Sequence, residues 1–421
     1  MFNKILKQRN CDRISTVKIF GTGGIFLEQN NYPSVFIHGF NGYGEPDLLN
    51  KKLPYWGLGK MDLLEHLRGL GYEIYNPSVG PHNSAWDRCC ELYAEIFGGT
   101  VDYGKVHSSK YGHARYGRTY EGLIPDLGSE GNHRKINLLG HSFGGPTVRL
   151  FSELLTNGSE EERRGTPEDE LSPLFKGGKG DLVHTVTTLS GVNNGTTYGD
   201  YIGKRGAVRA DLFLGIINIL LSETGYMREK DYRTDQWGLM RDPWENTLKN
   251  RLTWPFTFKR LRKLIIKTKS GDSMFHELSV SYWYERNRDF SLNGNTYYFA
   301  ERSCRSHWNR KGTCSPDRNM GPLMKGPSRV TGRYLPEKLA HYGVDKSWLP
   351  NDGVMNVMGQ SAPFSLPNTV YEEGEPIKPG IFYNMPVRNF DHMSWASVAV
   401  QRDEYFETYE KIMERNSLLP G

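Results

Sequence analysis

The sequence predicts an α/β fold in which a mostly parallel central sheet is covered by helices on both faces. Short apolar runs alternate with helical patterns over the first half of the chain, which is the order of βαβ units on a parallel sheet. One run, residues 136–139, is mainly apolar, so it needs burial on both of its faces, as a helix-covered parallel sheet provides. The composition, 37% hydrophobic with 47 glycines and 22 prolines, suits a globular protein with many loops.

The individual elements follow from the same patterns. We expect strands at residues 33–38, 72–79, 135–140 and 182–189, and helices at residues 61–70, 86–97 and 144–156. Between residues 97 and 135 a stretch rich in Gly, Tyr and His has no clear period and is too long for an ordinary loop. Something other than a hydrophobic core must order that stretch.

The length of 421 residues allows two average domains, but α/β folds often carry insertions within one unit. We predict a single domain over residues 1–421 with insertions at about 82–132, 195–290 and 303–334. The last insertion is polar, basic and aperiodic, and we expect it to be irregular.

The remaining composition excludes some classes of protein. A net charge of +5 is a small excess for this length, so a nucleic-acid partner is not expected. No segment approaches the roughly 20 apolar residues of a membrane span. The first ten residues lack the apolar run of a signal peptide, so either export does not use this route or the precursor begins elsewhere. Among five cysteines, Cys304 and Cys314 form the one plausible disulfide pair, and free thiols are an equal alternative.

The strongest local motif is Gly140–Gly144, which fits G-x-S-x-G between a predicted strand and a predicted helix. A nucleophilic serine needs a sharp turn that lifts its oxygen above the sheet, and Gly140 and Gly144 leave room for that backbone. We therefore predict Ser142 as a nucleophile. The bare motif is common by chance, and the flanking strand and helix give it weight.

Serine must be deprotonated by a histidine that a carboxylate orients, and in folds with this motif the order along the chain is Ser, acid, His. Asp352 lies in an Asn-Asp-Gly turn that can present a carboxylate from the end of a strand. His392 lies on a loop before a final helix expected at residues 395–415. An ordinary turn aspartate and a surface histidine are the simpler interpretations of each segment taken alone.

A tetrahedral oxyanion needs hydrogen-bond donors. The segment His38–Gly42 follows a predicted strand and has the form H-G-x-x-G, which places a backbone N–H over a substrate carbonyl. We assign the oxyanion hole to the amides of Phe40 and Phe143, the latter following the nucleophile. His38 is expected to be structural.

A metal site is a weaker prediction. Asp87, His107 and His113 lie in or near the aperiodic stretch, and imidazole with carboxylate can bind zinc. On spacing alone, solvated loop histidines are the simpler interpretation.

Motifs spread over most of the chain resemble the thermoalkaliphilic, zinc-containing bacterial lipases of the α/β-hydrolase superfamily. They are residues 38–42, 79–81, 83–88, 98–104, 112–115, 117–120, 235–239 and 351–353. The resemblance implies an α/β-hydrolase fold, a triad of Ser142, Asp352 and His392, an oxyanion hole at Phe40 and Phe143, and an extracellular location. It also implies zinc held by Asp87, His107, His113 and Asp235. Four protein ligands leave no open position, so this zinc would be structural.

The same resemblance implies a lid helix over an apolar acyl pocket, in the region of residues 211–223, although a buried core helix is an alternative. Residues 258–269 contain six Lys or Arg residues, which could help the protein meet an anionic lipid–water interface. We favour a solvated helix for them.

The chain also departs from these lipases. They usually have alanine and glutamine where this chain has Gly140 and Phe143, which bears on substrate shape. They have acidic calcium ligands where this chain has Ser394 and Ala399, so we predict no calcium site. The expected function is hydrolysis of acylglycerol esters by a lipase. A carboxylesterase or phospholipase and a non-catalytic hydrolase-fold binding protein are the alternatives, and the oligomeric state is open.

Overall fold

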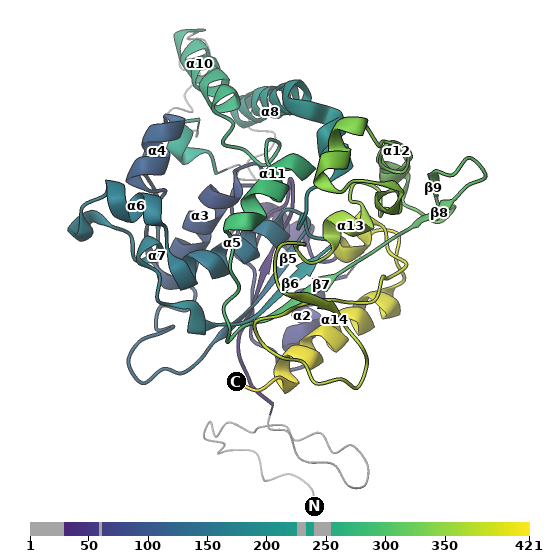
Figure 1. Ribbon diagram of the computed structural model, residues 1–421. Helices are drawn as coiled ribbons and strands as arrows, with labels where there is room; N and C mark the ends of the chain where they lie inside the picture. The colour runs from purple at the N-terminus through teal and green to yellow at the C-terminus, as the bar shows by residue number, and fades with distance from the viewer. Residues whose placement is uncertain (1–28, 59–60, 225–232, 240–253) are drawn as a thin grey trace, which may run out of the picture.

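The computed structural model describes residues 29–58, 61–224, 233–239 and 254–421. Its centre is a seven-stranded sheet of order β10-β11-β7-β6-β5-β1-β2, in which every pair of neighbours is parallel (Figure 1). The strands are β1 Ser34–Ile37, β2 Ile74–Tyr75, β5 Ile136–His141, β6 Val183–Leu189, β7 Tyr297–Glu301, β10 Asn368–Val370 and β11 Phe382–Asn384. The predicted α/β class with a parallel sheet is confirmed.

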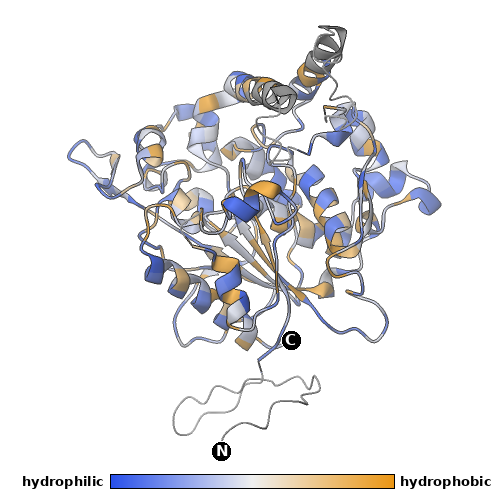
Figure 2. Cartoon of the chain, turned by 180° about the vertical axis from the view of Figure 1, so that it is seen from behind, coloured by the Kyte–Doolittle hydropathy of each residue, from blue (hydrophilic) through white to orange (hydrophobic). Residues whose placement is uncertain are grey.

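Helices cover both faces of this sheet because successive strand residues point to opposite sides. In β5, Leu138 joins one buried apolar cluster and Leu139 joins another. The first cluster contains residues of α3 (Ala85–Phe97) and α5 (Gly144–Asn157), and the second contains residues of α2 (Leu63–Gly69) and α14 (Arg402–Leu418). Seen from behind, the hydrophobic strands lie at the centre of the molecule, between these helices (Figure 2).

Local sequence explains where the helices start and stop. Ser84 caps α3 by accepting a hydrogen bond from the Asp87 N–H, and Asp62 caps α2 from the Glu65 N–H. Gly98 ends α3 with φ of 83°, a conformation that costs glycine little. These caps fix the bounds of the predicted elements within a few residues.

The aperiodic stretch after α3 folds into a two-stranded sheet and a short helix that are separate from the central sheet. Strands β3 (Gly99–Asp102) and β4 (Tyr116–Tyr120) pair antiparallel, and α4 (Lys105–Tyr111) lies between them in the chain. Helices α6 (Glu160–Gly165) and α7 (Pro173–Lys176) follow α5, and α6 contacts α4. The further elements are α1 Leu48–Lys52, α11 Val280–Arg286, α12 Pro322–Thr331 and α13 Val357–Gln360.

One expectation about the outer segments is wrong, and two others are made more definite. Residues 303–334 are not irregular throughout, since they contain α12 and an antiparallel pair of strands, β8 (Ser306–Trp308) and β9 (Cys314–Pro316). Cys304 and Cys314 are free thiols in the structure. The apolar helix expected near residues 211–223 is part of a longer one, α8 (Thr197–Thr224), which is interrupted at Gly203 with φ of 63°.

Helices α8 and α10 (Trp254–Ser270) pack together at the outer end of the molecule (Figure 1). Leu212 of α8 and Leu264 of α10 pack on one small apolar cluster with Trp237, whereas Phe213 and Ile266 are exposed. In the described part of the chain, no helix is both long enough and apolar enough to cross a membrane.

Candidate active site and metal cluster

Ser142 occupies the sharp turn between β5 and α5. Its φ of 56° is in the left-handed region, which is strained for a residue with a side chain. The turn needs its flanking glycines, because a Cβ at Gly140 would lie 2.2 Å from the Gly144 carbonyl oxygen, and one at Gly144 would lie 2.4 Å from the Ile37 carbonyl oxygen. The backbone therefore places the Ser142 hydroxyl at the carboxyl end of the sheet.

The three residues predicted as a triad lie in hydrogen-bonding contact. His392 Nδ1 lies 2.9 Å from Asp352 Oδ2, and His392 Nε2 lies 2.8 Å from Ser142 Oγ. Because a carboxylate oxygen accepts, Nδ1 carries the proton of the neutral ring, so Nε2 accepts from the serine hydroxyl. This is the arrangement in which an imidazole can act as a general base.

Asp352 is fully buried and its two oxygens are both occupied. Oδ1 accepts from the Met355 N–H at 2.9 Å, and Oδ2 accepts from the Ser303 hydroxyl at 3.3 Å as well as from His392. The residue lies in a turn, as expected, but not at the end of a strand: its turn is closed by an isolated bridge between Asn351 and Asn356.

The backbone of His392 is held as firmly as its ring. Its N–H donates to the Asp352 carbonyl at 2.8 Å, and its carbonyl accepts from His141 Nε2 at 3.0 Å. It begins a short 3-10 helix, His392–Ala396, capped by Asp391, whereas the helix expected at residues 395–415 is α14.

His141 links this loop to the nucleophile turn. Burial lowers the pKa of His141 well below its usual value, and the charge of a protonated His392 would lower it further. The neutral ring donates from Nε2 and accepts at Nδ1 from the Tyr55 hydroxyl, 2.7 Å away. The Tyr55 oxygen in turn accepts from the Gly39 N–H at 3.0 Å.

The expected oxyanion loop lies directly against the nucleophile. A Cβ at Gly39 would lie 2.7 Å from the Ser142 Cβ, so only glycine allows this approach. Neither the Phe40 N–H nor the Phe143 N–H donates a hydrogen bond to another described residue. Both amides are therefore available to a substrate oxygen. His38 is buried and bonds to the backbone of its own loop through the Gly39 carbonyl, as befits a structural residue.

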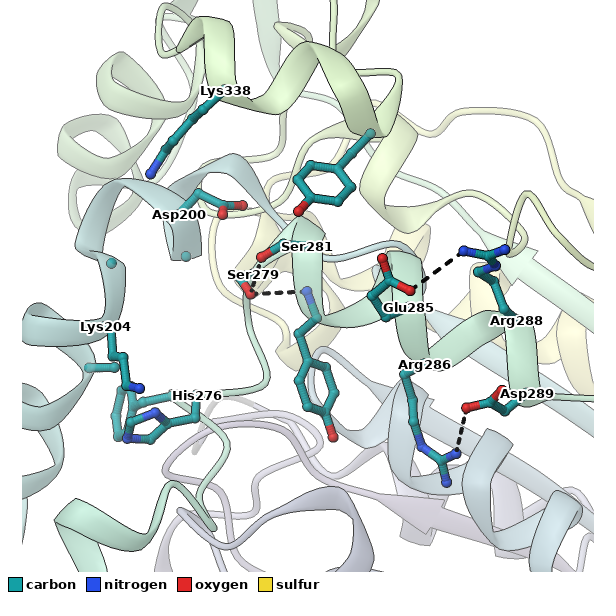
Figure 3. Close-up of a pocket in the computed structure, with 16 residues that line it drawn as sticks. Asp200, Lys204, His276, Ser279, Ser281, Glu285, Arg286, Arg288, Asp289 and Lys338 are labelled. Atoms are coloured by element: carbon teal, nitrogen blue, oxygen red, sulfur yellow. Dashed lines mark hydrogen bonds and ion pairs between the residues drawn. The ribbon is translucent and has the colours of Figure 1, made fainter.

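A cavity of about 1060 Å³ lies beside this loop (Figure 3). Phe275 lines the cavity and packs edge-on against Phe40, with ring centroids 5.4 Å apart. Apolar and charged residues share the wall, and the charged ones are Asp200, Lys204, Glu285, Arg286, Arg288, Asp289 and Lys338. Glu285 pairs with Arg288 at 3.6 Å.

A second cluster gathers three of the four predicted metal ligands. Asp87 of α3, His107 of α4 and His113 after α4 meet Asp272, and one ligand atom of each lies within 4.8 Å of the others. His107 Nε2 is 3.3 Å from Asp87 Oδ1, and His113 Nε2 is 3.4 Å from Asp272 Oδ2. These four atoms are buried and none has a well-formed hydrogen bond. Buried polar atoms that converge without partners fit a bound cation.

The prediction that Asp235 is the fourth ligand is wrong. Its carboxylate accepts hydrogen bonds from the Arg118 guanidinium, including one at 2.8 Å from Nη2, so it is already neutralised by that guanidinium. Asp272, which follows α10, takes its place in the cluster. The sequence gives no motif for Asp272, which lies in a Ser-Gly-Asp-Ser segment typical of a turn.

Neighbouring groups orient these side chains. Asp87 Oδ2 accepts from the Gln236 amide at 2.7 Å, which leaves Oδ1 to face the cluster. His113 Nδ1 donates to the Ala114 carbonyl at 2.8 Å, so Nε2 is the unprotonated nitrogen of the neutral ring. Trp86 stacks on His107, with ring centroids 5.0 Å apart. Two imidazoles and two carboxylates in this arrangement match zinc ligation.

Comparison with known proteins agrees with this architecture. The sequence profile of a family described as "Lipase-like, C-terminal domain" matches residues 30–415. Lipase 2 of Staphylococcus aureus is 34% identical over 377 residues, which are 88% of this chain and 51% of that protein. This chain thus spans about half the length of the curated relatives it matches.

Solved structures are similar over almost the whole chain. The Staphylococcus hyicus lipase superposes with a TM-score of 0.78 at 30% identity, covering 94% of this chain and 97% of that one. Lipase 1 from Pelosinus fermentans superposes with a TM-score of 0.73 at 36% identity, covering 93% and 100%. With the profile match and this shared fold, the chain belongs to the family described as lipase-like, C-terminal domain.

Proposed function

We propose that this chain is a serine-dependent carboxylic ester hydrolase of the lipase type, acting on acylglycerols. The observation that carries the proposal is the unbroken hydrogen-bond line from Ser142 Oγ through the His392 ring to Asp352. The names of the relatives, which are lipases, support the same chemistry.

In the first half of the reaction, Ser142 Oγ attacks the ester carbonyl while His392 Nε2 takes the hydroxyl proton. Asp352 holds the imidazole in the required tautomer and stabilises its positive charge. The carbonyl oxygen, now negative, accepts hydrogen bonds from the amides of Phe40 and Phe143. The leaving alcohol takes the proton from His392, and an acyl group stays on Ser142.

In the second half, a water molecule loses its proton to His392 Nε2 and attacks the acyl carbonyl. The same two amides stabilise the second oxyanion, and release of the fatty acid returns the proton to Ser142. The buried, neutral His141 beside His392 adds no competing charge to this cycle.

We also propose that the metal cluster holds zinc through Asp87, His107, His113 and Asp272. Bound zinc would supply structural cross-linking rather than water activation, since four protein ligands fill a tetrahedral shell. The ligands themselves join α3 and α4 to the segment that follows α10.

The substrate class and its setting are further parts of the proposal. Exposed Phe213 and Ile216 on α8 support a lid that meets lipid, as the resemblance implies. An extracellular location and a single domain with insertions are consistent with a lipase of this kind. Emulsified long-chain triglyceride, soluble short-chain ester and phospholipid vesicles, assayed side by side, separate a lipase from a carboxylesterase and from a phospholipase.

Labelling with a fluorophosphonate probe tests the enzymatic proposal directly. The folded chain is expected to be labelled at one site, and Ser142→Ala is expected to abolish the label, whereas exposed Ser109→Ala leaves it unchanged. Failure of the wild-type chain to react would favour a non-catalytic hydrolase-fold binding protein.

A further inference from the structure

Arg305 is a buried arginine that the sequence patterns leave uninterpreted. It follows β7, lies within residues 303–334, and is 4% exposed. A buried guanidinium needs acceptors for its N–H groups and a compensating negative charge. The partners it has therefore indicate what it does.

Among the described residues, every partner of the Arg305 side chain belongs to the loop that carries His392. Nε and Nη2 both donate to the Asn389 carbonyl, at 3.1 and 2.5 Å, and Nη1 donates to the Ala399 carbonyl at 2.5 Å. Nη1 also lies 3.9 Å from Asp391 Oδ2. One planar cation thus joins the chain before His392 to the chain after it.

The main chain of Arg305 contacts the turn that carries Asp352. Its N–H donates to the Asn351 carbonyl at 3.0 Å, directly before Asp352. The same residue therefore fixes the turn of the acid through its backbone and the loop of the base through its side chain.

The His392 loop has a backbone that needs such support. Ser397 and Ala399 have φ of 71° and 56°, and left-handed conformations are strained for residues other than glycine. The carbonyl of Ala399, one of these two residues, is the acceptor for Arg305 Nη1.

The residues at the two calcium positions implied by the resemblance do not fit that ion. Ser394 Oγ donates to Asp391 Oδ1 at 3.1 Å, and Ala399 offers only a carbonyl that Arg305 already occupies. Calcium needs six to eight oxygen ligands, mainly carboxylates and carbonyls. The oxygens at these two positions are therefore already engaged by protein groups.

We propose that Arg305 is a positioning residue whose guanidinium and backbone N–H hold the His392 loop against the Asp352 turn, making the placement of the imidazole independent of calcium. The inference rests on the proposed ester hydrolysis. Unlike a bound ion, the guanidinium is covalently attached to the chain and cannot dissociate from it.

Arg305→Ala and Arg302→Ala form a matched pair for the test. Arg302 lies three residues earlier and donates to the Met385 carbonyl at 3.0 Å, outside the His392 loop. With a soluble short-chain ester, Arg305→Ala is expected to lower kcat about 100-fold with KM within about twofold, because misplacement by ~1 Å costs about that factor. Arg302→Ala is expected to keep kcat within about threefold of wild type.

Two further measurements separate positioning from general stability. Added guanidinium ion at millimolar concentration is expected to restore kcat at least about fivefold in Arg305→Ala and to leave Arg302→Ala unchanged. Arg305→Lys, which keeps the charge without the planar fork, is expected to fall between wild type and Arg305→Ala. If Arg305→Ala does not fold, Arg305→Lys carries the same comparison.

The outcomes that overturn the inference differ from those that overturn the function. A wild-type chain that hydrolyses no ester removes the proposed function. Wild-type activity that is lost with EGTA and restored by calcium, or an Arg305→Ala kcat equal to wild type, removes the role of Arg305. Amide hydrogen exchange over residues 390–400, expected to be faster in Arg305→Ala than in Arg302→Ala, tests that role without any turnover.

Discussion

The triad and the metal cluster are both buried groups of polar side chains, but their hydrogen bonds differ. In the triad, Ser142, His392 and Asp352 satisfy one another, and backbone N–H groups complete the set. In the cluster, four ligand atoms face one another without a well-formed hydrogen bond. The first arrangement is complete with protein groups alone, whereas the second leaves four ligand atoms that could hold a cation.

Ser142→Ala should give the largest effect and test the catalytic half of this comparison. We expect kcat for a soluble ester to fall by about 10⁴-fold or more, because the nucleophile and its base act as one unit. Thermal unfolding should stay close to wild type, since the change removes one hydroxyl from a 9% exposed side chain. Retained turnover would mean that another group performs the attack.

Asp272→Asn and Asp235→Asn test the metal cluster, by asking which of the two carboxylates binds the cation. Asp272→Asn should reduce zinc affinity by more than about 100-fold, because even the loss of a group that only orients a ligand costs about 10–100-fold. Asp235→Asn should keep one zinc per chain and lose only its pair with Arg118. Metal analysis and competition with a chromogenic chelator measure both. The reverse ranking would restore Asp235 as the ligand.

Gly39→Ala tests how closely the oxyanion loop packs against Ser142, because it adds one methyl group between them. The new Cβ would lie 2.7 Å from the Ser142 Cβ and 3.3 Å from its Oγ, so we expect kcat to fall about 10- to 100-fold. Gly69→Ala in α2 is the control, because nothing lies within 4 Å of its Cβ. Equal rates for both variants would place the oxyanion loop farther from the nucleophile.

His141→Gln should give the smallest effect, and it tests whether the buried His141 ring stays neutral in the folded chain. Burial lowers the pKa of His141 well below the 6.5 of the unfolded chain. Below pH 6.5 His141 therefore binds a proton in the unfolded state but not in the folded state. The free energy of unfolding consequently decreases as the pH falls. One such proton contributes about 1.4 kcal/mol per pH unit to that slope.

The measurement is the free energy of unfolding in denaturant between pH 5 and 6.5. The slope should be shallower in His141→Gln than in wild type, and unchanged in His341→Gln, which replaces an exposed histidine. A steeper slope in His141→Gln would mean that the folded state protonates His141.

The sheet and the nucleophile turn could be predicted because their signals are local. A parallel strand must be apolar on both faces, and G-x-S-x-G constrains a backbone within five residues. The early strands and helices, such as α3 and α5, accordingly lie close to their expected bounds. The triad partners could be named because the order of Ser, acid and His along the chain agrees with the resemblance to zinc-containing lipases.

Asp272 and Arg305 could not be predicted because their partners come from distant parts of the chain. Asp272 joins ligands that lie far earlier in the sequence, and nothing in its own turn marks it. The motif around Asp235 resembles that of zinc-containing lipases, but Arg118 binds its carboxylate. In the sequence, Arg305 is one of several cations in a basic segment, and its role depends on contacts with the distant His392 loop.

The hydrogen-bond chain from Gly39 through Tyr55 and His141 to the His392 carbonyl couples two parts of the reaction machinery. In the proposed reaction, the Gly39 end positions the amides that receive negative charge, and the His392 end positions the ring that transfers protons. A disturbance at Tyr55 would therefore reach both at once, and formation and breakdown of the acyl intermediate would slow together, with no change in which of the two limits turnover.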